Sequence, residues 1–230
     1  MPIVLDNTAS LKTGATSGTF SHVVSAGLSD SLLLLTISLQ DSNHANLPIN
    51  TATYAGSAMT KVRQDTSNTN NVSAAVFYLV NPNIGTNNVV MTSTGAVWKG
   101  AISSSWSGVQ QSAQPDAQNG KGTANQSASV ASQIGTTVAD NSLIVGIVSS
   151  ETNLTGKFSD FTLTGIGTLQ GQSFENVCSM YKISGAAGAG TAGGTLASSQ
   201  SYNISWASFS PAAEISAAQG AWCSLLGVGL

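Results

Sequence analysis

The chain has 230 residues, of which only 7% are charged and 41% are hydrophobic, and its formal net charge is −3. Its 7 Lys and Arg residues are scattered, so the sequence offers neither a basic patch for nucleic acid nor a polybasic segment for a membrane surface. Soluble domains usually have about 25% charged residues, and here Ser, Thr, Asn, Gln and Gly replace them. This composition suits β-structure and excludes a disordered chain.

Apolar and alternating runs in the first half predict short strands separated by polar turns. One continuous apolar run, Asp30 to Asp41, is bracketed by two acids. It is too apolar for a strand with one wet face, so we expect it to be buried on both faces with its charged ends in water. A long polar turn is expected at Arg63–Asn71. The other expected strands are Ile3–Leu5, Thr19–Val24, Thr51–Val62 with a Gly-centred turn, Val72–Val80, Asn88–Thr94 and Lys99–Val109.

A second bracketed run, Asp140 to Glu151, has the same acid-to-acid spacing and predicts the central strand of a second half. Residues Gln110–Ser127 are the least apolar stretch, and we expect them to form the crossover between the halves. A Gly/Ala-rich loop is expected at Gly185–Gly194. Further strands are expected at Ser129–Val138, Phe158–Leu169, Val177–Ile183 and Tyr202–Phe209.

The two halves align as a repeat that covers about residues 19–109 and 128–211. Tyr78 matches Tyr181, and Trp106 matches Phe209 at the same offset, whereas the two bracketed runs need a larger offset. Short strands with turn signals between them are typical of a sandwich or a barrel. The sequence therefore predicts one all-β domain over residues 1–211, a jelly-roll-like β-sandwich made of two pseudo-repeated halves.

The chain continues past Pro211 as an apolar tail, residues 212–230, for which a short helix is expected. Its only charged side chain is that of Glu214. A solvated segment of this composition would be sticky, so it must be buried either on its own sandwich or on a neighbouring subunit. The low charge of the whole chain favours the second alternative, because obligate interfaces are depleted in charge. In a homo-oligomer, the side chains expected to contact another copy are Trp222, Leu225 and Leu226.

A G-x-G-x-x-G string occurs at Gly188–Gly193. A dinucleotide site would require a helix that begins inside this string and an acid about 20 residues further on. A strand pattern follows instead, so the string favours a Gly/Ala loop on the surface. No cofactor is predicted.

The candidates for nucleophilic or metal chemistry are few. The two histidines, His22 and His44, lie in an early strand and in a loop, with no G-x-S-x-G elbow and no cluster of His and Cys. Neither a catalytic triad nor a metal site is therefore predicted. Of the two cysteines, Cys178 lies in an expected core strand, which favours a buried free thiol over a disulfide with Cys223.

Two further hypotheses involve carbohydrate. The repeated acids, for example Asp30 and Asp140, occupy matching strand ends and are either an acid pair of a glycan hydrolase, a calcium site, or simply the points where buried strands leave the core. The last alternative is favoured. Trp98 follows a Gly-Ala-Val turn and is a candidate for stacking on a sugar, whereas Trp106 and Trp206 lie in core-like strands.

Four motifs of strand and turn residues stand out along the chain. They are Tyr54-Ala-Gly-Ser-Ala-Met-Thr60, Phe77-Tyr-Leu-Val-Asn-Pro82, Ser105-Trp-Ser-Gly-Val109 and Ala207-Ser-Phe-Ser-Pro-Ala212. Together they resemble a recurring β-sandwich module of phage virion proteins and of large bacterial surface proteins. The resemblance spans about Thr19 to Ala212 and implies a jelly-roll-like fold with a structural or adhesive role. It carries over no catalytic residue.

The N-terminal sequence Met-Pro-Ile-Val-Leu-Asp lacks the basic and long apolar regions of a signal peptide, and no apolar run is long enough to cross a membrane. With a surface composition typical of extracellular proteins, this favours a non-enzymatic structural protein of a bacteriophage particle: a head decoration, capsid-associated or tail-associated subunit. Its expected partners are other copies of itself and other virion proteins. The alternative is a carbohydrate-binding module or adhesin, located extracellularly or on a cell surface, that binds surface glycans.

Overall fold

The computed structural model describes residues 1–41, 48–67, 72–150, 162–167 and 177–213, with the backbone alone for Ser67, Trp98, 123–134, 162–167 and 190–201. The regular elements of these ranges are all β-strands and none is a helix, which confirms the all-β prediction. The strands are β1 (Val4–Thr13), β2 (Ser17–Val24), β3 (Leu32–Gln40), β4 (Ile49–Tyr54), β5 (Ser57–Ala58), β6 (Thr60–Ser67), β7 (Val72–Val80), β8 (Gly85–Ser93), β9 (Trp98–Ser107), β10 (Ala117–Thr137), β11 (Leu143–Ser150), β12 (Thr162–Gly167), β13 (Val177–Ile183) and β14 (Gly188–Phe209).

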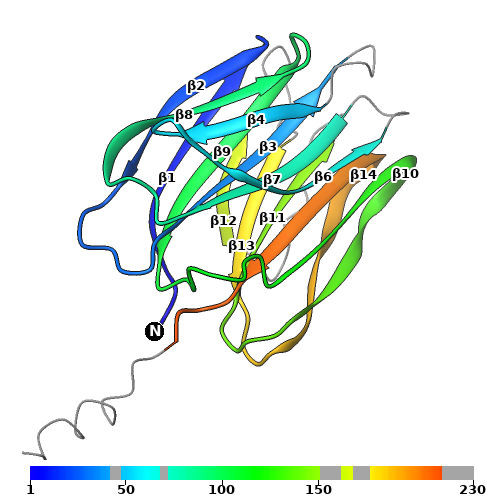
Figure 1. Ribbon diagram of the computed structural model, residues 1–230. Coiled ribbons are helices and arrows are strands. Elements are labelled where there is room, and N and C mark those ends of the chain that lie inside the picture. The colour runs from blue at the N-terminus through cyan, green and yellow to red at the C-terminus, as the bar shows by residue number, and fades with distance from the viewer. Residues whose placement is uncertain (42–47, 68–71, 151–161, 168–176, 214–230) are drawn as a thin grey trace, which may run out of the picture.

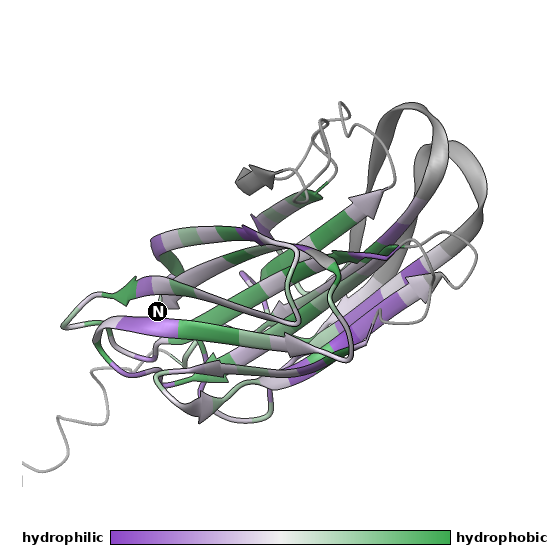
Figure 2. Cartoon of the chain, turned by 90° about the horizontal axis from the view of Figure 1, so that it is seen from above, coloured by the Kyte–Doolittle hydropathy of each residue, from purple (hydrophilic) through white to green (hydrophobic). Residues whose placement is uncertain are grey.

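The strands form three antiparallel sheets that are stacked in layers, as the β-sandwich prediction requires (Figure 1). Sheet 1 has the order β1-β9-β3-β7-β6, sheet 2 the order β2-β8-β4-β5, and sheet 3 the order β10-β14-β11-β13-β12. Sheet 1 is the middle layer. One of its faces packs against sheet 2 and the other against sheet 3, so hydrophobic stretches run through the middle of the molecule (Figure 2).

Strand β3 lies at the centre of sheet 1 and is buried on both faces, as the bracketed apolar run predicts. Leu33 and Leu35 belong to the core between sheets 1 and 2, whereas Leu32 and Leu34 belong to the core between sheets 1 and 3. A two-residue period sends successive side chains to opposite faces, so only a continuous apolar run can fill both cores. Strand β11 does the same in sheet 3, with the residues of its run divided between two cores.

Sheets 1 and 3 have the same strand order, if β10, β14, β11, β13 and β12 are matched to β1, β9, β3, β7 and β6. Leu32 lies between Val80 and Trp106, and Leu143 lies in the same way between Ile183 and Phe209. The register therefore matches Leu32 to Leu143.

This register corrects the alignment of the two bracketed runs. The counterpart of Asp30 is Asn141, and not Asp140 as the spacing of the acids suggested. The backbone confirms the match, because both residues have positive φ angles, of 51° for Asp30 and 58° for Asn141. The far end of the second run, at Glu151, lies outside the described residues.

Strands β10 and β14 pair along their whole length as one long ribbon, interrupted by register shifts between Thr123 and Gln133. The ribbon folds back over the outer face of sheet 3 (Figure 1). A Cβ on Gly135, near the end of β10, would lie only 2.4 Å from the ring of Trp206, which belongs to the other end of the ribbon. The folded-back part of the β10–β14 ribbon thus covers sheet 3 in the way that β2 and β8 of sheet 2 cover sheet 1 in the first half.

Three expectations about loops are wrong. The predicted crossover Gln110–Ser127 is shorter, because β10 already begins at Ala117. The expected Gly/Ala loop at Gly185–Gly194 is mostly the beginning of β14, and the expected turn at Arg63–Asn71 is partly β6. The apolar tail beyond Ala213, with its expected helix, lies outside the described residues.

Sheets 1 and 3 face each other, and contacts between them occur twice. In the second copy of such a contact, each residue is replaced by its counterpart from the other half of the chain. Trp106 of β9 packs edge-on against Tyr181 of β13, with ring centroids 4.7 Å apart. Their counterparts Phe209 and Tyr78 form the equivalent pair at 5.6 Å. Likewise β6 contacts β10 while β12 contacts β1, and β3 meets β11. This is the pattern of a self-complementary, two-fold interface, formed here within one chain.

Candidate functional site

The most enzyme-like group of side chains lies between sheets 1 and 2, around His22 of β2. Its Nε2 is 3.0 Å from Oγ of Ser105, and its Nδ1 is 2.8 Å from Oγ of Ser103. Ser105 in turn donates a 2.8 Å hydrogen bond to the Asp6 carboxylate. His22, Ser103 and Ser105 are all buried. We call these four residues the His22 cluster.

The order of the contacts distinguishes this cluster from a catalytic triad. In a triad the carboxylate holds the imidazole and the imidazole takes the proton of the serine. Here the single hydroxyl proton of Ser105 goes to Asp6, so the ring N–H at Nε2 must donate to Ser105, and Nδ1 accepts from Ser103. Ser105 is therefore not activated by His22.

The pKa values fit this arrangement. Burial lowers the pKa of His22 to about 4, and the charge of Asp6, which raises this pKa, does not offset the effect of burial, so the ring is neutral at pH 7. For Asp6, burial raises the pKa, but hydrogen bonds from Ser25, Ser105 and Asn7 together outweigh it and leave the pKa below its usual value. The cluster acts as a hydrogen-bonded link between the two sheets.

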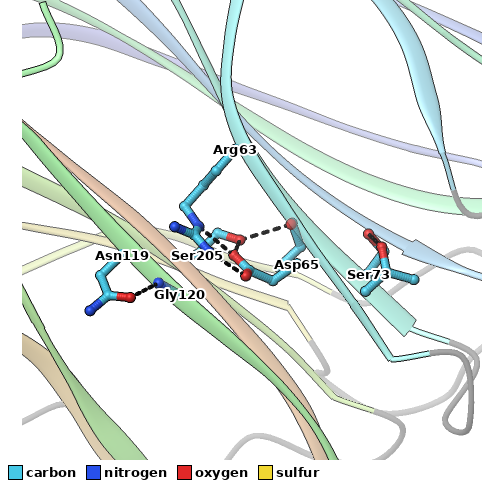
Figure 3. Close-up of polar contacts among 8 residues, drawn as sticks. Arg63, Asp65, Ser73, Asn119, Gly120 and Ser205 are labelled. Atoms are coloured by element: carbon cyan, nitrogen blue, oxygen red, sulfur yellow. Dashed lines mark hydrogen bonds and ion pairs between the residues drawn. The ribbon is translucent and has the colours of Figure 1, made fainter.

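A second polar cluster lies where the edge of sheet 1 meets sheet 3 (Figure 3). Arg63 and Asp65 of β6 form a two-pronged ion pair, with Nε–Oδ2 and Nη2–Oδ1 distances of 2.6 and 2.5 Å. Asp65 also accepts a hydrogen bond from Ser205 of β14. A Cβ on Gly120 of β10 would lie 2.1 Å from the Asp65 carboxylate, so only glycine fits there. This cluster joins the two halves of the chain.

Asp30 and Asp140, the candidates for a glycan hydrolase or calcium site, lie just before β3 and β11 and bond to the backbone there. Asp140 accepts a 2.7 Å hydrogen bond from the backbone N–H of Ala187, just before β14. The backbone carbonyl of Asp30 accepts from Val109. Among the described residues, no group of three or more His, Cys, Asp or Glu side chains is arranged to hold a metal ion. Within the same ranges no helix is long and apolar enough to cross a membrane.

A groove lies at the end of the molecule where β3 and β11 begin. Its volume is about 550 Å³. The N-terminus lies at this end, next to the point where the described chain stops (Figure 1), and the N-terminal ammonium donates a 3.1 Å hydrogen bond to the carbonyl of Ala212. We call it the terminal groove. Its lining residues are Met1, Pro2, Ile3, Asn141, Ile183, Pro211, Ala212 and Ala213.

The exposed large apolar side chains of the described residues gather at this same end. The backbone N–H of Ser25, just after β2, donates to Asp6 near the start of β1, and that of Val138, just after β10, donates to Asp116 near the start of β10. The first bond places the end of β2 beside the start of β1. The second places the end of the long strand β10 beside its own start. The exposed side chains are Met1, Val4, Val23, Ile84 and Val138.

The structure describes the predicted site residues only in part. Trp98 is the first residue of β9, and only its backbone is described. Trp222, Leu225 and Leu226 lie outside the described residues. Trp106 and Trp206 are buried packing residues and Cys178 is a buried free thiol, as predicted.

Sequence reasoning missed the His22 cluster and the terminal groove. The alternation of serines at 103 and 105 was a usable signal for the cluster, because it places both hydroxyls on the face of β9 that looks toward sheet 2. The groove had no such signal, since four separate segments form it.

Searches against protein-family models, curated proteins and solved structures each returned no match.

Proposed function

We propose that this chain is a non-enzymatic structural subunit of a bacteriophage particle, as a head decoration, capsid-associated or tail-associated protein. Its partners are copies of itself and other proteins of the particle. The protein is assembled in the host cytoplasm and works in the virion, with no cofactor.

The observation that carries the proposal is the apolar character of one end of the molecule. The terminal groove, the exposed apolar side chains and the start of the apolar segment 214–230 lie together there. Monomeric soluble proteins avoid large exposed apolar patches, and patches of this kind mark interaction sites. With only 7% charged residues, the chain also has the low charge typical of the cores of permanent interfaces.

The layered architecture supports the same function. Two sandwich-like halves are joined by paired aromatic rings and by a half-buried polar cluster, so the chain forms one stack of three sheets. Strand β3 and its counterpart β11 have no exposed apolar face left. Such a body is suited to bear load or fill space in an assembly.

The test is to look for the chain in purified particles. Particles produced from the genome that encodes the chain are isolated on a density gradient and analysed by peptide mass spectrometry. We expect its peptides in the particle fraction at a ratio comparable to capsid or tail proteins, and its gene beside genes for such proteins.

Recovery only from the medium or the cell surface, free of particles, would contradict this function and favour the carbohydrate-binding or adhesin alternative. A glycan array separates the two further. Binding to a glycan that is lost in Trp98→Ala would assign the chain to the alternative class.

A further inference from the structure

We propose that the terminal groove is the docking site for the C-terminal segment, residues 214–230, of a neighbouring copy. The inference rests on the proposed function in that it requires copies to assemble, and it adds the acceptor surface and the geometry of the contact.

The groove is suited to an apolar occupant. Ile3 and Ala212 are buried beneath it, each with 8% of its surface exposed, and Ile183 and Pro211 are half-buried in its wall. Among the lining side chains only that of Asn141 is polar, and the N-terminal ammonium of Met1 donates its hydrogen bond to the carbonyl of Ala212. Its volume of about 550 Å³ lies within the range of roughly 300–1,000 Å³ that is usual for pockets that bind drug-sized molecules. A tryptophan or a pair of leucines is a matching occupant.

The segment 214–230 carries such side chains and little charge. It contains Trp222, Leu225 and Leu226, and Glu214 is its only charged side chain. Burial of large apolar side chains is the main favourable contribution to protein association, so these residues are the ones expected to hold two copies together.

The position of Ala213 favours a neighbouring copy over the chain's own segment. Ala213 lines the groove, so the segment starts at the rim. If it is helical, as the sequence predicts, the rise of about 1.5 Å per residue carries Trp222 about 13 Å and Leu225 about 18 Å away from that rim. The apolar side chains then project beyond their own groove and reach the groove of another molecule.

The surroundings of the groove fit a contact between copies. Ile84 and Val138 have 61% and 74% of their surface exposed, and both lie at this end of the molecule but do not line the groove. In a monomer most of the surface of each of these two residues is exposed to water. A neighbouring copy whose C-terminal segment is docked in the groove would cover Ile84 and Val138. These two residues would then form part of the rim of the interface.

A disulfide-trapping experiment on the full chain tests the inference. The native Cys223 lies beside Trp222 in the segment, and Pro2→Cys places a second thiol on an exposed residue of the groove. The other native thiol, Cys178, does not interfere, because it is buried and burial raises its pKa to about 12. The variant is oxidised with a mild disulfide catalyst and analysed on non-reducing gels.

We expect reducible bands at twice the mass of one chain and above, formed in most of the protein. They should disappear when Cys223→Ser is added. The matched control is Ile84→Cys, which lies on the rim of the contact but outside the groove. Cys223 of a segment docked in the groove is not expected to reach this rim position, so the control should form less than a tenth of the cross-linked product.

A cross-link confined to single chains, seen as a shifted band at monomer mass, would show that each segment fills its own groove and overturn the inference. Equal cross-linking of the Pro2→Cys and Ile84→Cys variants, or none, would show that the groove is not the docking site. Neither result bears on whether the chain is found in particles, so the proposed function is tested separately.

Discussion

At the scale of single residues, this chain uses short polar side chains inside its layers. Between sheets 1 and 3, Thr36 donates a 2.9 Å hydrogen bond to Ser179, and the hydroxyls of Ser38 and Ser149 are 2.5 Å apart. Buried polar groups need partners, and short hydroxyl side chains find them without forcing the sheets apart. The high content of Ser and Thr is therefore partly a property of the interior and not only of the surface.

The His22 cluster gives a prediction about pH. The pKa of His22 is about 4 in the folded protein and 6.5 in the unfolded chain, so the unfolded chain binds the proton more readily. The stability from the neutral ring is fully present above pH 6.5 and is lost as the pH falls toward 4. The loss is at most about 3 kcal/mol, reduced by solvent near Asp6.

Urea unfolding of the wild type and of His22→Gln at pH 7.5, 6, 5 and 4 measures this loss. Glutamine does not titrate and still offers a donor and an acceptor between the two serines. The free energy of unfolding of the variant should fall less steeply between pH 6.5 and 4. Parallel profiles for the two proteins would show that His22 is not a neutral, buried link.

At the scale of elements, the central strands were predictable, whereas the edge strands β1 and β10 were predicted only in part. The runs at β3 and β11 were recognisable because burial on both faces requires continuous apolar residues, whereas β10 begins with a polar, Gly-containing stretch that resembles a loop. That stretch is an edge strand, where polar residues and glycine are common. The alignment of the acids failed because Asp30 and Asn141 share a backbone conformation and not a charge.

The terminal groove and the clusters could not be predicted, because residues from distant parts of the chain form them. The groove combines Met1 with Ile183 and Pro211, and the second polar cluster combines Arg63 with Ser205. A sequence pattern reports on neighbours along one strand. It carries no information about which strand lies opposite until the order of the strands is known.

The close approach of β10 to β6 gives a prediction for Gly120. In Gly120→Ala the new Cβ would lie about where the Asp65 carboxylate and the Arg63 guanidinium now are, and the carbonyl of Ile204 is 2.6 Å away. Either the ion pair or the strand must move, which we expect to cost about 1–3 kcal/mol. The matched control is Gly185→Ala, where nothing lies within 4 Å of the new Cβ.

Chemical denaturation followed by tryptophan fluorescence compares the two variants. We expect a clear decrease in the denaturation midpoint for Gly120→Ala and a change within about 0.5 kcal/mol for Gly185→Ala. Equal effects would contradict a tight junction between the halves at β10.

At the scale of the whole molecule, the chain resembles a dimer whose two subunits have been joined. Sheets 1 and 3 have equivalent strand orders, and the two aromatic pairs between them are equivalent as well. The two halves are therefore related by a two-fold axis that runs roughly along the strands. Such an axis places the starts of β3 and β11 at the same end of the molecule. The termini of the described chain and the terminal groove lie at that end. The two halves of the molecule are thus held together internally, and the terminal groove is left open at one end.

The most direct test of assembly through this end is the molar mass in solution, measured by light scattering, of the full chain and of a chain that stops after Ala213. The cut keeps Ala212, whose N–H donates to Gly108 and whose carbonyl accepts from Met1, so the body should stay folded. We predict a mass of several subunits for the full chain and of one subunit for the truncated chain. The same number of subunits for the full chain and the truncated chain would contradict assembly through the C-terminal segment.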